Sequence, residues 1–137
     1  MTAEEEIDPD SPYAVLGGRD VVLALSERFY DYMEEHEPEL AKLHELDENG
    51  RITRAARDRF ALFLVGWLGG PQEYMARHGH PRLRMRHARV PVGLEMRDAW
   101  MRSMKAALET TEMPGPVRDF LTQRFGEVAD FLRNVEG

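Results

Sequence analysis

"GHPRLRMRHARVP", residues 79–91, is the stretch that decides the fold, because it places four arginines and two histidines in an otherwise acidic chain. The protein has 18 Lys and Arg against 25 Asp and Glu, a formal net charge of −7 at pH 7. Such a segment is either a solvated charged surface or a site for a flat ligand that is anionic at one edge and takes an imidazole. Helix breakers precede it, and residues 69–91 exceed the roughly 2–8 residues that usually connect bundle helices. A long segment of this kind favours a binding function.

The composition limits the possible classes of protein. The negative net charge argues against nucleic acid as a partner, and no apolar run reaches the roughly 20 residues that a membrane span needs. The chain has no cysteine, which excludes disulfides and thiolate metal sites and is compatible with a cytoplasmic location. With 137 residues and 42% hydrophobic content, it suits one globular domain. We interpret residues 1–12 as a flexible acidic leader and residues 13–137 as that single domain.

Helical periodicity runs through almost the whole chain. Within residues 18–36, apolar side chains recur three to four positions apart at Val22, Leu25, Phe29 and Met33. Thr53 can cap the N-terminus of the next helix, and Gly69, Gly70 and Pro71 would end that helix. No strand pattern competes, so the sequence predicts an all-α domain. The expected helices are 18–36, 37–46, 52–68, one or two turns before Gly79, 81–88, 93–109 and 116–134.

Four motifs appear in a characteristic order: "RFYDYM" at 28–33, "GWLGGPQEY" at 66–74, "GHPRLRMRH" at 79–87 and "RDAWMRSM" at 97–104. Together they resemble the group II truncated haemoglobins, and the resemblance extends from about Tyr13 to the C-terminus. It implies a truncated globin-like fold, in which a two-over-two helical sandwich surrounds a haem.

The resemblance also implies how haem b would be held. The last histidine of the basic motif, His87, corresponds to the proximal ligand of the haem iron. Arginine pairs well with carboxylates, so arginines near this motif are candidates for binding the haem propionates. The further cofactor-binding candidates are Arg84, Arg86, Arg57 and Arg59 for the propionates, Met85 for the porphyrin face, and Phe60, Phe63 and Leu64 for the apolar wall.

On the opposite, distal side, the family places three hydrogen-bonding residues around the ligand. The first two correspond to Tyr30 and Trp100. The third lies at the end of a short helix, and counting from Pro38 selects His44. A longer spacer, as in some relatives, would select Leu46 or Asp47 instead.

The expected function is the binding of O2 and other diatomic ligands, such as NO and CO, at ferrous haem iron. NO dioxygenase-like or peroxidase-like chemistry, with a reductase as partner, is also compatible with the family. We expect a monomer or a homodimer, with neither nucleic acid nor membrane as partner. The alternative from a different class is a haem-based sensor or a haem-free helical adaptor, and an absorption spectrum separates these readings.

Overall fold

The computed structural model describes residues 7–79 and 93–131. Within these two ranges the secondary structure is helical, apart from an isolated antiparallel bridge between Leu46 and Ile52. The described helices are α1 (Pro12–Leu16), α2 (Arg19–His36), α3 (Pro38–Ala41), α4 (Arg54–Trp67), α5 (Glu73–His78), α7 (Leu94–Glu109) and α8 (Gly115–Phe131).

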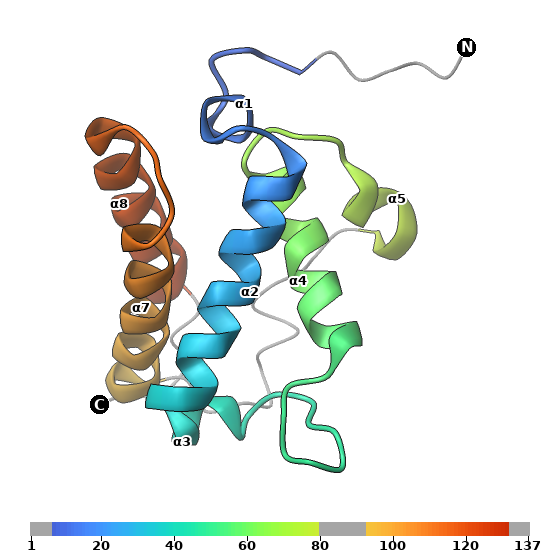
Figure 1. Cartoon of the computed structure of the whole chain (residues 1–137), viewed down its shortest axis with the longest axis vertical. Helices are drawn as coiled ribbons and strands as arrows, with labels where there is room; N and C mark the ends of the chain where they lie inside the picture. The colour runs from blue at the N-terminus through green and yellow to red at the C-terminus, as the bar shows by residue number, and fades with distance from the viewer. Residues whose placement is uncertain (1–6, 80–92, 132–137) are drawn as a thin grey trace.

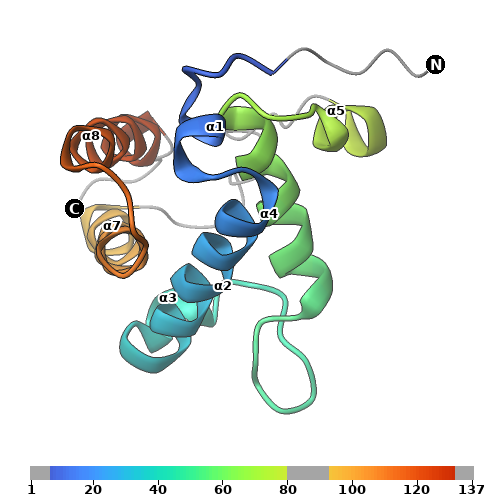
Figure 2. The same cartoon turned by 45° about the horizontal axis from the view of Figure 1, so that its top comes forward.

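The longer helices form two packed pairs. Helix α2 lies at the centre, with α4 on one side and α7 on the other, and α8 packs against α7 (Figure 1). The second view keeps this order, with α4 and α5 on one side of α2 and the α7–α8 pair on the other (Figure 2). This is the two-over-two arrangement that the resemblance predicts.

The apolar stripe of α2 holds the two pairs together. Val22, Leu25, Phe29 and Met33 are at most 1% exposed, as the periodicity predicts. Burying a side chain of this size stabilises the fold by roughly 1.5–3 kcal/mol, so the stripe makes α2 the centre of the core. Fully buried apolar counterparts on the other helices include Leu64, Val65, Met104, Leu108 and Leu121.

Local signals end and begin the helices where the sequence predicts. The Thr53 hydroxyl accepts a hydrogen bond from the Ala56 amide at 3.2 Å and caps the N-terminus of α4. Gly79, with a φ of 74°, ends α5. Such a left-handed backbone is open to glycine without steric cost.

One predicted helix boundary was wrong, and one helix was not predicted. The helix expected over 37–46 stops at Ala41, because the Leu43 and His44 amides bond carbonyls three residues back, a tighter turn than an α-helix. The chain then folds back on itself through the bridge between Leu46 and Ile52. Helix α1 was not predicted, and its cap Ser11, which is buried, lies within the expected leader of residues 1–12.

In the part of the chain that the structure describes, no helix is both long and apolar enough to cross a membrane.

Candidate functional site

Tyr30, on α2, lies where this helix meets α4 and the loop between α3 and α4. Its side chain is almost fully buried, with 4% exposed. The centre of its ring is 4.9 Å from the Phe29 ring, 5.5 Å from the Phe60 ring of α4 and 5.7 Å from the His44 ring, all in edge-to-face or near-perpendicular orientation. Aromatic rings prefer these geometries at such separations. The Tyr30 ring is therefore confined on several sides.

Trp100 approaches the same aromatic group from α7. Its half-buried ring lies 5.3 Å from Phe29, edge to face, and 5.8 Å from Phe125 of α8. Phe29 thus contacts both Tyr30 and Trp100, two residues that are 70 positions apart in the chain. The sequence assigned Phe29 only to the core, since a stripe of apolar residues does not indicate which of them borders a site.

Of the three candidates for the third distal position, His44 is the one whose ring lies against Tyr30. Its Nδ1 is 3.0 Å from the Leu40 carbonyl oxygen. A carbonyl only accepts, so this contact requires the proton on Nδ1. Leu46 is 38% exposed, and the Asp47 carboxylate accepts hydrogen bonds from the Asn49 and Arg51 amides within the turn.

The surroundings of Tyr30 keep its hydroxyl protonated. Burial raises the pKa of Tyr30 well above its ordinary value, because the phenolate would be poorly solvated. The positive charges of Arg57 and Arg59 act in the opposite direction, and burial outweighs them. The Tyr30 phenol is therefore protonated at neutral pH and can donate a hydrogen bond.

Two aromatic side chains of α4 form an apolar surface beside this group. Phe60 and Phe63 lie in one layer, with ring centres 6.2 Å apart and planes 24° apart, and both pack on the core while staying partly exposed. Leu64, in contrast, is fully buried in the core. A surface of this kind suits a large, flat, apolar group such as haem.

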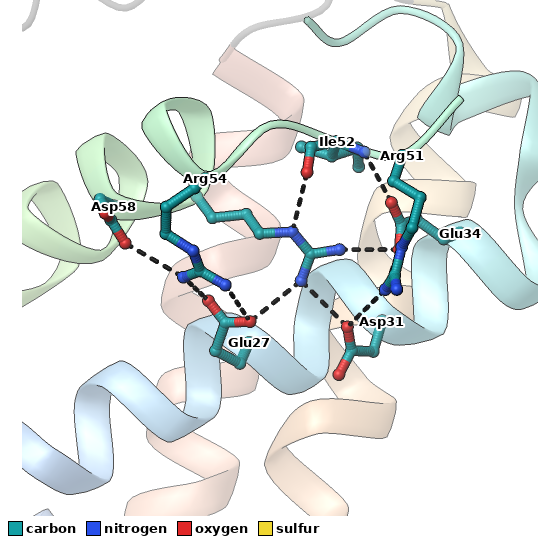
Figure 3. Close-up of polar contacts among 8 residues, drawn as sticks. Glu27, Asp31, Glu34, Arg51, Ile52, Arg54 and Asp58 are labelled. Atoms are coloured by element: carbon teal, nitrogen blue, oxygen red, sulfur yellow. Dashed lines mark hydrogen bonds and ion pairs between the residues drawn. The ribbon is translucent and has the colours of Figure 1, made fainter. Parts of the chain in front are cut away.

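Arg57 has partners that the sequence analysis did not foresee. Its guanidinium contacts three carboxylates of α2 and the Ile52 carbonyl, and Figure 3 labels these partners, Glu27, Asp31, Glu34 and Ile52. Nη1 donates to Glu27 at 3.0 Å and to Asp31 at 2.9 Å, Nη2 donates to Glu34 at 2.7 Å, and Nε donates to the Ile52 carbonyl at 3.1 Å. The side chain is 4% exposed. Arg57 is therefore committed to carboxylates of the protein itself, and its guanidinium cannot turn toward a haem propionate without breaking these bonds.

Neighbouring residues extend this ion-pair cluster toward the surface. Arg54 contacts Glu27 and Asp58, and Arg51 contacts Glu34. Arg59 differs, because it is half-buried and has no ion pair with a carboxylate within residues 7–79 and 93–131. Of the two α4 arginines considered for the propionates, only Arg59 remains.

Four residues of the expected site, Arg84, Met85, Arg86 and His87, lie outside the described residues. Their proposed contacts with haem rest on the sequence.

The chain is similar to known globins over nearly its whole length. A sequence model of the bacterial-like globin family matches residues 11–134. The group 2 truncated hemoglobin YjbI of Bacillus subtilis is 34% identical over 125 residues, which cover 91% of this chain and 89% of that protein.

Solved structures show the same similarity. The cold-adapted truncated hemoglobin of the Antarctic marine bacterium Pseudoalteromonas haloplanktis superposes with a TM-score of 0.85 at 38% identity, covering 92% of this chain and 99% of that one. The group II 2-on-2 hemoglobin of Agrobacterium tumefaciens has a TM-score of 0.83 at 28% identity, covering 99% of this chain and 100% of that one.

Proposed function

Because the chain belongs to the bacterial-like globin family and, within it, to the group II truncated haemoglobins, we propose that it holds haem b through His87 and binds O2 on the opposite side. Tyr30, Trp100 and His44 are the residues proposed to face the ligand. The observation that carries this proposal is that Tyr30 of α2 and Trp100 of α7 both contact Phe29, while His44, from a loop, contacts the Tyr30 ring.

When bound, haem supplies a ferrous iron with one open position for a diatomic ligand such as O2, NO or CO. The Tyr30 hydroxyl and the Trp100 indole N–H are hydrogen-bond donors, and O2 held there carries partial negative charge. Both donors stabilise the held ligand and slow its release. Phe60 and Phe63 exclude water from that side of the pocket.

The role of His44 follows from its contact with Leu40. With the Nδ1 proton engaged by the Leu40 carbonyl oxygen, the neutral ring has an unprotonated Nε2, which accepts rather than donates. We propose that His44 mainly supports the Tyr30 ring, which it meets at 5.7 Å. His44→Leu should then speed O2 release by up to about tenfold, while Leu46→Ala leaves release unchanged. Equal effects of the two substitutions would assign this wall of the pocket to the loop as a whole.

The remaining contacts proposed for haem come from charge and shape. Arg84, Arg86 and Arg59 are the candidates for the propionates, and Met85 for the porphyrin face. The same pocket would also support turnover of NO or peroxide with electrons from a reductase in the cytoplasm. We propose O2 binding as the primary role of the protein, as a monomer or a homodimer.

Absorption spectra of the purified protein and of His87→Ala test the central claim. We expect a Soret band for the parent, its loss or severe distortion in His87→Ala, and a normal band in the control His36→Ala, whose side chain is exposed. An unchanged ferrous spectrum for His87→Ala would refute the assignment of the proximal ligand. A colourless parent that rejects added haemin would instead indicate a haem-free adaptor.

A further inference from the structure

Arg57 is a buried charge that packing alone does not account for. Removing a guanidinium from water costs several kcal/mol, and apolar side chains of similar size often stabilise a fold as well as a buried ion pair does. Here three carboxylates and one carbonyl are arranged to hold this single group. An arrangement of this kind favours a role that depends on where the guanidinium lies.

The guanidinium lies over the ring of Tyr30. Its central carbon is 5.5 Å from the ring centre, within the range of a cation–π interaction. The carboxylates that hold it, Glu27, Asp31 and Glu34, are spaced four and three residues apart on α2, the helix that carries Tyr30. Helix α2 therefore supplies both the tyrosine and the anchors of the cation that covers its ring.

The same cluster reaches the loop that carries His44. Arg57 Nε donates to the Ile52 carbonyl, and Glu34 accepts from the Ile52 amide at 2.6 Å. Ile52 in turn forms the bridge with Leu46. Tyr30 is thus covered by Arg57 and approached by His44, and the cluster ties both elements to α2.

We propose that Arg57 is a positioning residue for Tyr30. It holds the ring so that the hydroxyl points at the ligand, and it secures the loop that brings His44 against the same ring. This inference rests on the proposed function, in which Tyr30 donates to the ligand. A planar guanidinium bonded at four points cannot shift without breaking several hydrogen bonds, which makes it a rigid cover for the ring.

The first test is a double-mutant cycle on O2 release by the haem-loaded protein. Arg57→Met keeps an unbranched side chain but removes the charge and the planar group. We expect it to speed O2 release by roughly threefold to tenfold, part of the effect of losing the whole hydrogen bond. In a Tyr30→Phe background the same substitution should change release less than about twofold, because the hydroxyl on which Arg57 acts is gone.

Two further variants make the result specific. Arg54→Met is the matched control, because Arg54 also pairs with Glu27, but its other partner is Asp58 and not the Tyr30 ring. We expect Arg54→Met to leave O2 release unchanged. Arg57→Lys keeps the charge and should remain folded even if Arg57→Met does not. It should speed release by a smaller factor than Arg57→Met, again only when Tyr30 is present.

A second readout does not depend on ligand release. In the ferrous CO form, the 13C signal of the Tyr30 ζ carbon is identified by its loss in Tyr30→Phe. It should shift or broaden in Arg57→Met or Arg57→Lys and stay in place in Arg54→Met. An unmoved signal in both Arg57 variants would overturn the proposal.

The outcomes separate this proposal from the function on which it rests. If Tyr30→Phe alone leaves O2 release unchanged, the distal role of Tyr30 is wrong, and so is the role of Arg57 in ligand release. If Tyr30→Phe speeds release but the Arg57 variants act equally in both backgrounds, or in neither, Arg57 is structural only and the positioning role is refuted.

Discussion

Glu34→Gln is the substitution that best probes the ion-pair cluster, because it removes one charge and almost no volume. The Glu34 carboxylate accepts from the Ile52 amide at 2.6 Å, from Arg57 at 2.7 Å and from Arg51 at 3.0 Å. The side chain is 15% exposed. A glutamine can keep the bond to Ile52 through its oxygen, but its NH2 group then faces the arginines as a second donor.

The expected cost follows from these contacts. The bond between Arg57 and Glu34 is charge-assisted and buried, so losing it costs about 1.5–3 kcal/mol, and making the Ile52 bond neutral costs about 1 kcal/mol more. The bond to Arg51 adds little, because Arg51 is largely exposed. Arg57 keeps Glu27 and Asp31, which limits the total to about 2–4 kcal/mol. For a chain of this length that lowers Tm by roughly 7–14 °C.

The loss depends on pH in a defined direction. Burial raises the pKa of Glu34, but the bonds from Ile52, Arg51 and Arg57 outweigh it, so the pKa in the folded protein lies below its ordinary value. A lowered pKa stabilises the fold above the unfolded-state value near 4.3, and this stabilisation disappears as the pH falls through the folded-state pKa. The difference in stability between parent and variant should therefore be full at pH 7 and shrink below about pH 4.

Urea unfolding at matched haem content, measured from pH 3 to pH 8, checks both magnitude and direction. Glu35→Gln is the control, since the adjacent residue Glu35 has a side chain that is 75% exposed. Within the described structure, its ion pair is a 3.8 Å contact with His36. The control substitution should change the free energy of unfolding by less than about 0.5 kcal/mol. Equal losses for the two variants, or a Glu34→Gln loss that is constant with pH, would refute the reasoning.

Other predictions concern the distal donors, a close approach and a helix cap. Trp100→Phe removes the indole N–H and should speed O2 release, measured by stopped flow, by about one to two decades. When it is combined with Tyr30→Phe, the two effects on release should be less than additive. Full additivity would mean that the two donors do not share a ligand. Gly70→Ala would place a Cβ 2.6 Å from the Tyr13 ring and 2.8 Å from the Val65 carbonyl oxygen, so it should destabilise the protein by about 1–3 kcal/mol in urea. Gly126→Ala, in the middle of α8 and 3.9 Å from the nearest side chain outside its helix, should stabilise it by about 0.5–1 kcal/mol. Thr53→Ala should cost about 1 kcal/mol through the lost cap of α4, and an unchanged thermal midpoint would contradict that.

The sequence by itself determined the features that depend on nearby residues. The apolar stripe of α2, the Thr53 cap and the glycine at the end of α5 were all predicted correctly, because helical period and capping involve residues within a few positions of one another. The order of four motifs was also enough to identify the family. The family resemblance in turn made Tyr30 and Trp100 candidates for the distal ligand-binding site.

Tertiary structure decided what depends on packing between distant segments. The guanidinium of Arg57 meets Glu27, Asp31 and Glu34, which lie 30, 26 and 23 positions earlier in the chain. Read locally, Arg57 is one of several arginines on a helix and as suitable for a propionate as Arg59. The packing of α4 on α2 brings the three carboxylates to Arg57, and a buried guanidinium must take the acceptors within its reach because water is no longer available to solvate it.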